Sequence, residues 1–98
     1  MIFAPIYIDD AAAILAAAHE GRWNEAVNAA SPDALSLRAA GETIARVLGR
    51  ELKIERNPSS PPLNLVPDLA RLKRHMPTHR FTSFEDGVRA IARARGLI

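Results

Sequence analysis

Cysteine is absent from the 98 residues of this chain. The absence excludes disulfide bonds, thiol nucleophiles and zinc sites built on cysteine thiolates, and it is typical of a cytosolic protein. Long apolar runs are missing too, because none approaches the roughly 20 residues that cross a bilayer. The first residues lack the basic flank and apolar centre of a signal peptide. We therefore expect a cytoplasmic chain without a membrane partner.

Glycine is scarce and scattered along the chain. The five glycines are Gly21, Gly41, Gly49, Gly87 and Gly96. They lie too far apart for the Gly-x-Gly-x-x-Gly turn that binds phosphates, and no Gly-x-Ser-x-Gly elbow is present. The one tyrosine, Tyr7, is followed four residues later by Ala11 and not by lysine, which excludes a tyrosine–lysine proton-transfer pair at helical spacing. The residues thus predict no catalytic set and no cofactor loop within this chain.

Charge is divided unevenly between the two halves of the chain. The net charge is +2, but residues 1–49 carry three Lys or Arg against six Asp or Glu, whereas residues 50–98 carry ten against five. The densest basic cluster comprises Arg71, Lys73, Arg74, His75, His79 and Arg80. Such a cluster is consistent with a polyanion or protein partner, or with a solvated surface of mixed sign. The lack of interleaved aromatic residues disfavours nucleic acid.

The clearest periodic pattern lies in the middle of the chain. Apolar residues recur there at offsets of three, four and seven, at Leu37, Ala40, Ile44, Val47 and Leu48. This spacing predicts an amphipathic helix with Ser36 as its N-cap and Gly49 as its end. Leu52 and Ile54 then alternate with charged residues, which predicts a short strand. A helix that leads into a strand indicates an α/β layer.

The remaining elements are predicted from propensity and end signals. Residues 6–8 and 23–30 favour strands, and a helix follows the first of these up to Glu20, with Asp9 and Asp10 at its positive end. A third helix is expected from about Pro67 to Met76.

A final helix is expected after a capping box formed by Thr82 with Glu85 or by Ser83 with Asp86. Its apolar stripe comprises Phe84, Val88, Ile91 and Ala92, and Gly96 ends it. The composition, 48% hydrophobic and 24% charged, suits one domain over residues 1–98. The expected fold is a single layered α/β domain, a small α+β-like lobe with about four helices and two to three short strands.

Three groups invite a functional interpretation, and each has a structural alternative. The adjacent carboxylates of Asp9 and Asp10 suit helix capping better than a metal site, since no third ligand is near in sequence. The His75-x-x-x-His79 spacing resembles a two-ligand metal face, but Pro77 would break the helix that the spacing requires. Trp23 is either a packed residue or a platform on which a ligand stacks. We therefore expect no metal site.

A loop rich in proline and serine occupies residues 57–64. Loops of this length inside a compact domain are often functional. The polar residues at the loop and its base are Arg56, Ser59, Ser60 and Asn64. We expect them to be the part of the chain that faces a substrate.

Five stretches, taken in order, resemble the C-terminal portion of the NAD-dependent epimerase/dehydratase family, the extended short-chain dehydrogenase/reductases. Residues 6–12 are similar to its "hydrophobic-x-hydrophobic-Asp-Asp-x-Ala" entry into a helix, and residues 25–31 to its "Glu-x-Tyr-Asn-Val-Gly-Ser" strand. Residues 35–54 resemble its "Ser-Leu-Arg-Glu-Leu-Ala-Glu-x-Ile-Ala-x-x-Leu-Gly" helix with the strand that follows. Residues 66–73 resemble "Ala-Asp-x-Ser-Arg-x-Lys", and residues 82–88 resemble "Thr-Ser-Leu-Glu-Glu-Gly-Leu".

The resemblance implies a substrate-binding lobe that is inactive alone. Full members of the family bind NAD(P) in an N-terminal Rossmann domain with a glycine-rich loop and a Tyr-x-x-x-Lys pair, while the C-terminal lobe shapes the pocket for a substrate, often a nucleotide sugar. The chain is then either a fragment of a longer protein, with a Rossmann domain as its implied partner, or a truncated relative that has lost that domain. Self-association is expected of the lobe by itself. Residues 57–64 contain no arginine, so the family's phosphate-binding arginine has no counterpart here.

Overall fold

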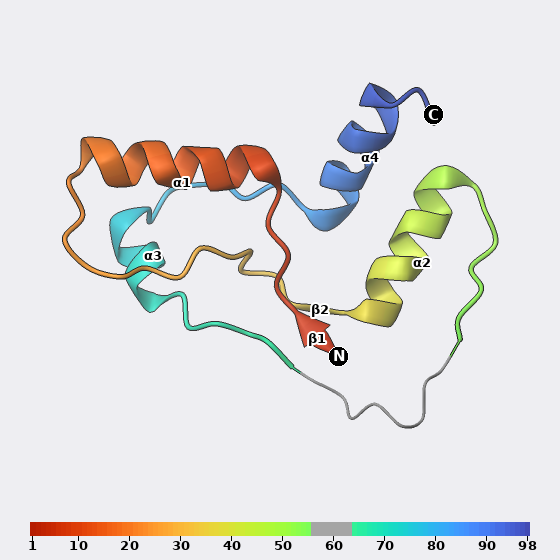
Figure 1. Ribbon diagram of the computed structural model, residues 1–98, viewed down its shortest axis with the longest axis horizontal. Coiled ribbons are helices and arrows are strands. Elements are labelled where there is room, and N and C mark those ends of the chain that lie inside the picture. The colour runs from red at the N-terminus through yellow and green to blue at the C-terminus, as the bar shows by residue number, and fades with distance from the viewer. Residues whose placement is uncertain (56–63) are drawn as a thin grey trace.

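The computed structural model describes residues 1–55 and 64–98. Within them lie four helices and two short strands, in the order β1 (Ile2–Phe3), α1 (Ile8–Glu20), β2 (Leu35–Ser36), α2 (Leu37–Leu48), α3 (Ala70–His75) and α4 (Phe84–Ala94). Figure 1 shows this arrangement. The expected class, a small mixed α/β domain, is confirmed.

The two strands form an antiparallel pair. Ile2 lies opposite Ser36, and Phe3 opposite Leu35. On its other side β1 is bridged in parallel by Leu65, whose N–H donates to the carbonyl of Ile2 over 2.8 Å. The N–H of Ile2 donates to Oδ1 of Asn64 over 2.9 Å. β1 is thus held between two segments that lie far from it in the sequence.

The three strands predicted from the sequence are wrong. Ile8 is the first residue of α1 rather than the end of a strand, and residues 23–30 and 52–54 pair with no strand in the described residues. Short runs of this kind carry little intrinsic preference, so the available partner decides. Leu52 illustrates this, because its side chain packs on α2, with Cδ1 at 3.3 Å from the position a Cβ would take on Gly41.

The ends of α2 and α4 follow the predicted signals. The hydroxyl of Ser36 accepts from the N–H of Ala39, and that of Ser83 accepts from the N–H of Asp86. The second bond decides between the two possible capping boxes in favour of Ser83. Gly49 and Gly96 adopt left-handed backbone with φ of 66° and 69°, as expected for residues that end a helix.

The other two helices differ from expectation at their first turns. Neither Asp9 nor Asp10 caps α1, because Tyr7 precedes the helix and no side chain makes a capping bond there. α3 begins only at Ala70, since Oδ1 of Asp68 accepts from the N–H of Ala70 and holds the chain in a turn. The end of α3 at His75 lies close to the predicted end.

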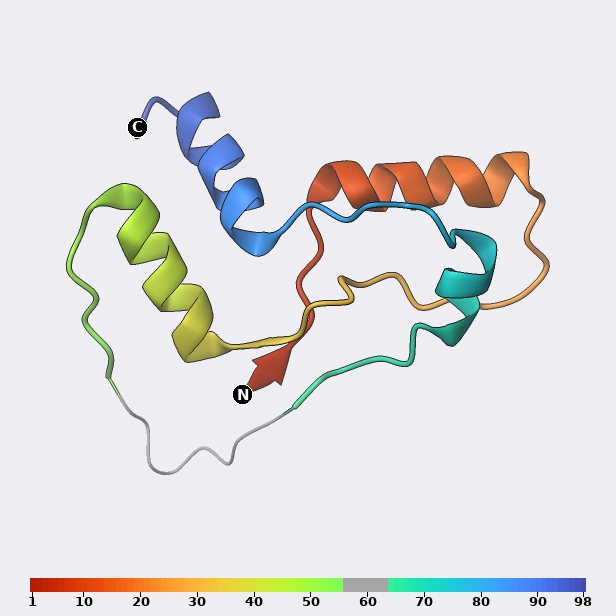
Figure 2. The same cartoon turned by 180° about the vertical axis from the view of Figure 1, so that it is seen from behind.

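The molecule is flat and its buried core is small. Its principal extents are 45 × 36 × 17 Å and its radius of gyration is 15.8 Å, against about 13 Å for a compact domain of this length. The buried apolar residues of the described chain are Ile14, Ala30, Ala40, Val47, Leu72 and Ala92. Helices α2 and α4 pack together, and long segments lead from them toward α1 and α3 (Figure 2). Among the described residues, none of the helices combines the length and apolar character needed to span a membrane.

Candidate functional site

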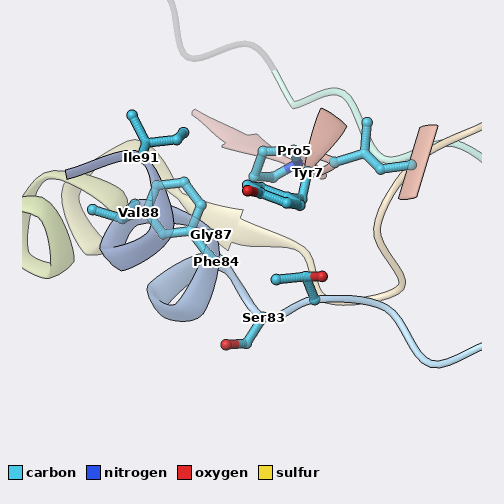
Figure 3. A pocket seen from close by; sticks show the side chains of 9 residues that line it. Pro5, Tyr7, Ser83, Phe84, Gly87, Val88 and Ile91 are labelled. Atoms are coloured by element: carbon cyan, nitrogen blue, oxygen red, sulfur yellow. The ribbon is translucent and has the colours of Figure 1, made fainter. Parts of the chain in front are cut away.

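A cavity of about 100 Å³ lies where the segment before α1 meets the first turns of α4. Figure 3 shows Pro5 and Tyr7 on one side of it, with Phe84, Val88 and Ile91 on the other. Ile91 is 50% exposed, which places it at the open side of the cavity. Most of the residues that line the cavity are apolar.

The Tyr7 ring lies directly against the backbone of α4 at Gly87. A Cβ on Gly87 would stand 2.9 Å from Cδ1 of Tyr7, closer than real Cβ atoms approach. Glycine inside a helix costs up to about 1 kcal/mol relative to alanine. Its place in α4 is explained by the room that the tyrosine ring needs. Tyr7 and Gly87 together thus shape the cavity.

Asp10 connects the first turn of α1 to the segment that leads into α4. Its side chain is buried, with the residue only 5% exposed. Its Oδ2 accepts from the N–H of Thr82 over 2.9 Å, and its Oδ1 lies 2.9 Å from Nε2 of His79. A carboxylate can only accept, so Nε2 of His79 carries the hydrogen. The aspartate that the sequence assigned to helix capping instead positions the entry to α4.

The charge state of Asp10 fits this positioning role. Burial acts to raise the pKa of the Asp10 carboxyl, but the hydrogen bonds from Thr82 and His79 outweigh it, so the pKa lies below its ordinary value. The group is therefore ionised at neutral pH. An ionised carboxylate accepts both hydrogen bonds and thereby holds Thr82 and His79 in place.

A second cluster joins the segment after α1 to α3. The Trp23 ring stacks on His75 with centroids 4.2 Å apart, and Nε2 of His75 lies 2.8 Å from Oε1 of Glu25. Nε of Arg71 lies 3.6 Å from Oε2 of the same carboxylate. The single tryptophan is therefore a packed residue in this structure, as one of its two interpretations predicted.

The two histidines that resembled a metal face bind different carboxylates. His75 contacts Glu25, whereas His79 contacts Asp10. Residues 1–55 and 64–98 contain no group of three or more His, Cys, Asp or Glu side chains that could hold a metal ion. The spacing of the pair in the sequence does not bring the two rings to one site.

Part of the basic cluster is used inside the fold. Nη1 of Arg71 donates to the carbonyl of Ala26 over 2.9 Å, in addition to the contact of Arg71 with Glu25. A shallow polar hollow of about 500 Å³ lies beside it, lined by Asn28, Asp68, Arg71 and Arg74 among others. Both signs of charge are present at this hollow.

The predicted substrate-facing residues fall mostly outside the described residues. Arg56, Ser59 and Ser60 lie there, and Asn64 uses its side-chain oxygen to hold β1. Sequence reasoning missed the cavity between Tyr7 and Gly87, although two signals were available. Gly87 interrupts a helical pattern, which often marks a close approach of another group, and Asp10 shares a helix face with Ile14 four residues on.

Comparison with known proteins found no match among family models, curated proteins or solved structures.

Proposed function

We propose that this chain is the substrate-binding lobe of an NAD(P)-dependent oxidoreductase of the epimerase/dehydratase kind, acting on a nucleotide sugar or a related substrate. One observation carries the proposal. Apart from Pro5 and Ile91, the residues that line the cavity belong to the first and the last of the five stretches that carry the family resemblance. A mostly apolar cavity with a few polar groups is the usual form of a small-molecule site. The cofactor and the catalytic tyrosine and lysine would come from a Rossmann domain, and the whole would work in the cytoplasm.

The uncovered apolar surface of α1 supports a domain partner. Ile8 and Leu15, on the outer face of α1, are 70% and 72% exposed, while Ile14 on the inner face is buried. Residues 11–18 are all apolar. A helix that is apolar around its whole circumference is normally covered on both sides, and a cofactor domain would supply the second cover.

Two measurements test the proposal. The reading frame that encodes the chain is expected to contain roughly 200 further residues that begin with a glycine-rich βαβ unit. Titration of the 98-residue chain with NADH and NADPH, followed by their fluorescence, is expected to show no binding in the micromolar range. Micromolar binding of either nucleotide, or turnover of a sugar substrate by this chain alone, would contradict the proposal.

The alternative is a small interaction domain that binds a polyanion or a protein through the basic cluster at Arg71–Arg80. The polar hollow beside Arg71 and Arg74 is the observation in its favour. Glu25 counts against it, because it already contacts Arg71 and His75. Binding to heparin that weakens steeply with salt, and that weakens further on replacement of Arg71 and Lys73 by alanine, would favour this alternative.

A further inference from the structure

The size of the Tyr7 cavity limits what it accepts. Its volume is about 100 Å³, whereas a cavity of roughly 150 Å³ in another protein holds one benzene molecule. The cavity here is open at Ile91, so a ligand can extend outward from it. By this comparison the cavity itself encloses about four non-hydrogen atoms, and any further atoms of a ligand lie at its open side.

The walls of the cavity carry no charge. No Arg, Lys, His, Asp or Glu is among the residues that line it. The charged side chains in the first turn of α4, Glu85 and Asp86, are acidic, and Glu85 is paired with Arg46 and Arg89. A nucleoside diphosphate is therefore too large to enter the cavity itself, and its phosphates would meet no positive charge among the lining residues.

Three residues with hydroxyl groups line the cavity, namely Tyr7, Thr82 and Ser83. The N–H of Thr82 donates to Asp10, and the hydroxyl of Ser83 accepts from Asp86. The hydroxyl of Tyr7 makes no hydrogen bond to another residue of 1–55 or 64–98. A ligand hydroxyl or carbonyl can pair with it, since a phenol both donates and accepts.

We infer that the Tyr7 cavity binds the uncharged, mainly apolar end of a small hydroxyl- or carbonyl-bearing substrate, and that this substrate is not a nucleotide sugar. The inference rests on the proposed function, because it names the substrate class of that lobe. The apolar group fills the space between Tyr7, Phe84 and Val88, its hydroxyl or carbonyl meets the Tyr7 hydroxyl, and the rest of the molecule leaves past Ile91.

The test uses the isotopically labelled 98-residue chain, with cyclopentanol as the probe. Cyclopentanol is expected to shift the Gly87 amide and the Val88 and Ile91 methyl resonances saturably in the millimolar range. Uridine diphosphate glucose is expected to leave these resonances unchanged. Tyr7→Phe keeps the ring and removes the hydroxyl, so it should weaken cyclopentanol binding about fivefold, the equivalent of one hydrogen bond of about 1 kcal/mol.

A pair of tryptophan substitutions supplies the control. Ile91→Trp fills the mouth of the cavity and should weaken cyclopentanol binding at least tenfold. Leu15→Trp, at an exposed apolar position on α1, should leave it unchanged. Both positions are at least half exposed, and the dispersion of the amide spectrum checks that each variant folds.

Two results would overturn the inference. One is the absence of saturable shifts at Gly87, Val88 and Ile91 with cyclopentanol. The other is tighter binding of uridine diphosphate glucose at the same resonances. Either result leaves the lobe assignment standing. Micromolar NAD(P)H binding by the chain alone would instead remove the lobe assignment while leaving the cavity shifts as they are.

Discussion

Asp10 and His79 lie 69 residues apart in the sequence, yet a carboxylate oxygen of one stands 2.9 Å from the imidazole Nε2 of the other. The same carboxylate accepts the N–H of Thr82. Through these two bonds the first turn of α1 holds the segment that enters α4. The cavity between Tyr7 and Gly87 therefore depends on a side chain that does not line it.

Removal of the Asp10 carboxylate is expected to destabilise the fold. Asp10→Ala leaves the Thr82 N–H and the His79 ring without their partner, and loss of hydrogen bonds to a buried charge costs about 2–3 kcal/mol. Asp9→Ala is the matched control, because Asp9 is the exposed neighbour and should cost less than about 0.5 kcal/mol. Urea denaturation gives both values. Equal effects of the two substitutions would show that the bonds from Asp10 contribute little.

The free energy of unfolding is expected to decrease as the pH is lowered. The pKa of Asp10 lies below its ordinary value of 3.8, because the Thr82 and His79 hydrogen bonds outweigh burial. The hydrogen bond from His75 lowers the pKa of Glu25 below 4.5. Below about pH 5 the unfolded chain thus binds more protons than the folded one, so the free energy of unfolding declines as the pH falls further. Urea midpoints between pH 7 and 3 measure the decline, and Asp10→Asn should make it shallower. Parallel curves for the two proteins would contradict this account.

Replacing two glycines inside helices by alanine should change the stability of the fold in opposite directions. Gly87→Ala gains up to about 1 kcal/mol in helix propensity, but its Cβ would meet the Tyr7 ring at 2.9 Å. Overpacking of this kind costs about 1–3 kcal/mol, so a net loss of about 1 kcal/mol is expected. Gly41→Ala meets only the tip of the Leu52 side chain at 3.3 Å, and it should stabilise by about 0.5 kcal/mol.

The double variant Tyr7→Leu/Gly87→Ala tests whether contact with the Tyr7 ring is what makes Gly87→Ala destabilising. With the ring gone, Gly87→Ala should no longer destabilise in that background. Thermal or urea unfolding of the four proteins of this cycle gives the coupling between the two positions. A coupling near zero would mean that Tyr7 does not limit position 87.

The N-terminal caps of α2 and α4 should each contribute measurably to the stability of the fold. Ser36→Ala and Ser83→Ala remove hydroxyls that accept from Ala39 and Asp86, and each should cost about 1 kcal/mol. Thr82→Ser is the control beside Ser83, since it keeps a hydroxyl and the Thr82 N–H that donates to Asp10. A loss for Thr82→Ser as large as that for Ser83→Ala would overturn the assignment of Ser83 as the cap.

The isolated chain is expected to self-associate through its uncovered apolar surface. Leu15 is 72% exposed on the apolar outer face of α1, and apolar surface of this kind drives association. Light scattering over a range of concentrations should show a rising mass, and Leu15→Glu should lower it. Lys53→Glu, on the segment beside α2, serves as a control for added negative charge. A monomer at every concentration would argue against the expectation.

Local signals predicted the helices well, because capping and periodicity act within a few residues. Ser36, Gly49, Ser83 and Gly96 mark the ends of α2 and α4 where the sequence placed them. The strand predictions were wrong because strand pairing depends on segments that are distant in the sequence. A two-residue strand such as β1 has no pattern of its own, and it exists because residues 35–36 and Leu65 happen to lie beside it.

By itself the sequence determined which segments become helices and the unequal charge of the two halves, since these depend on residue type and short spacing. The tertiary structure alone decided which charges meet. It paired the carboxylates of Asp10 and Glu25 in the acidic half with the basic half at His79, His75 and Arg71. It also placed Tyr7 against Gly87, because only folding brings the first residues to the start of the last helix.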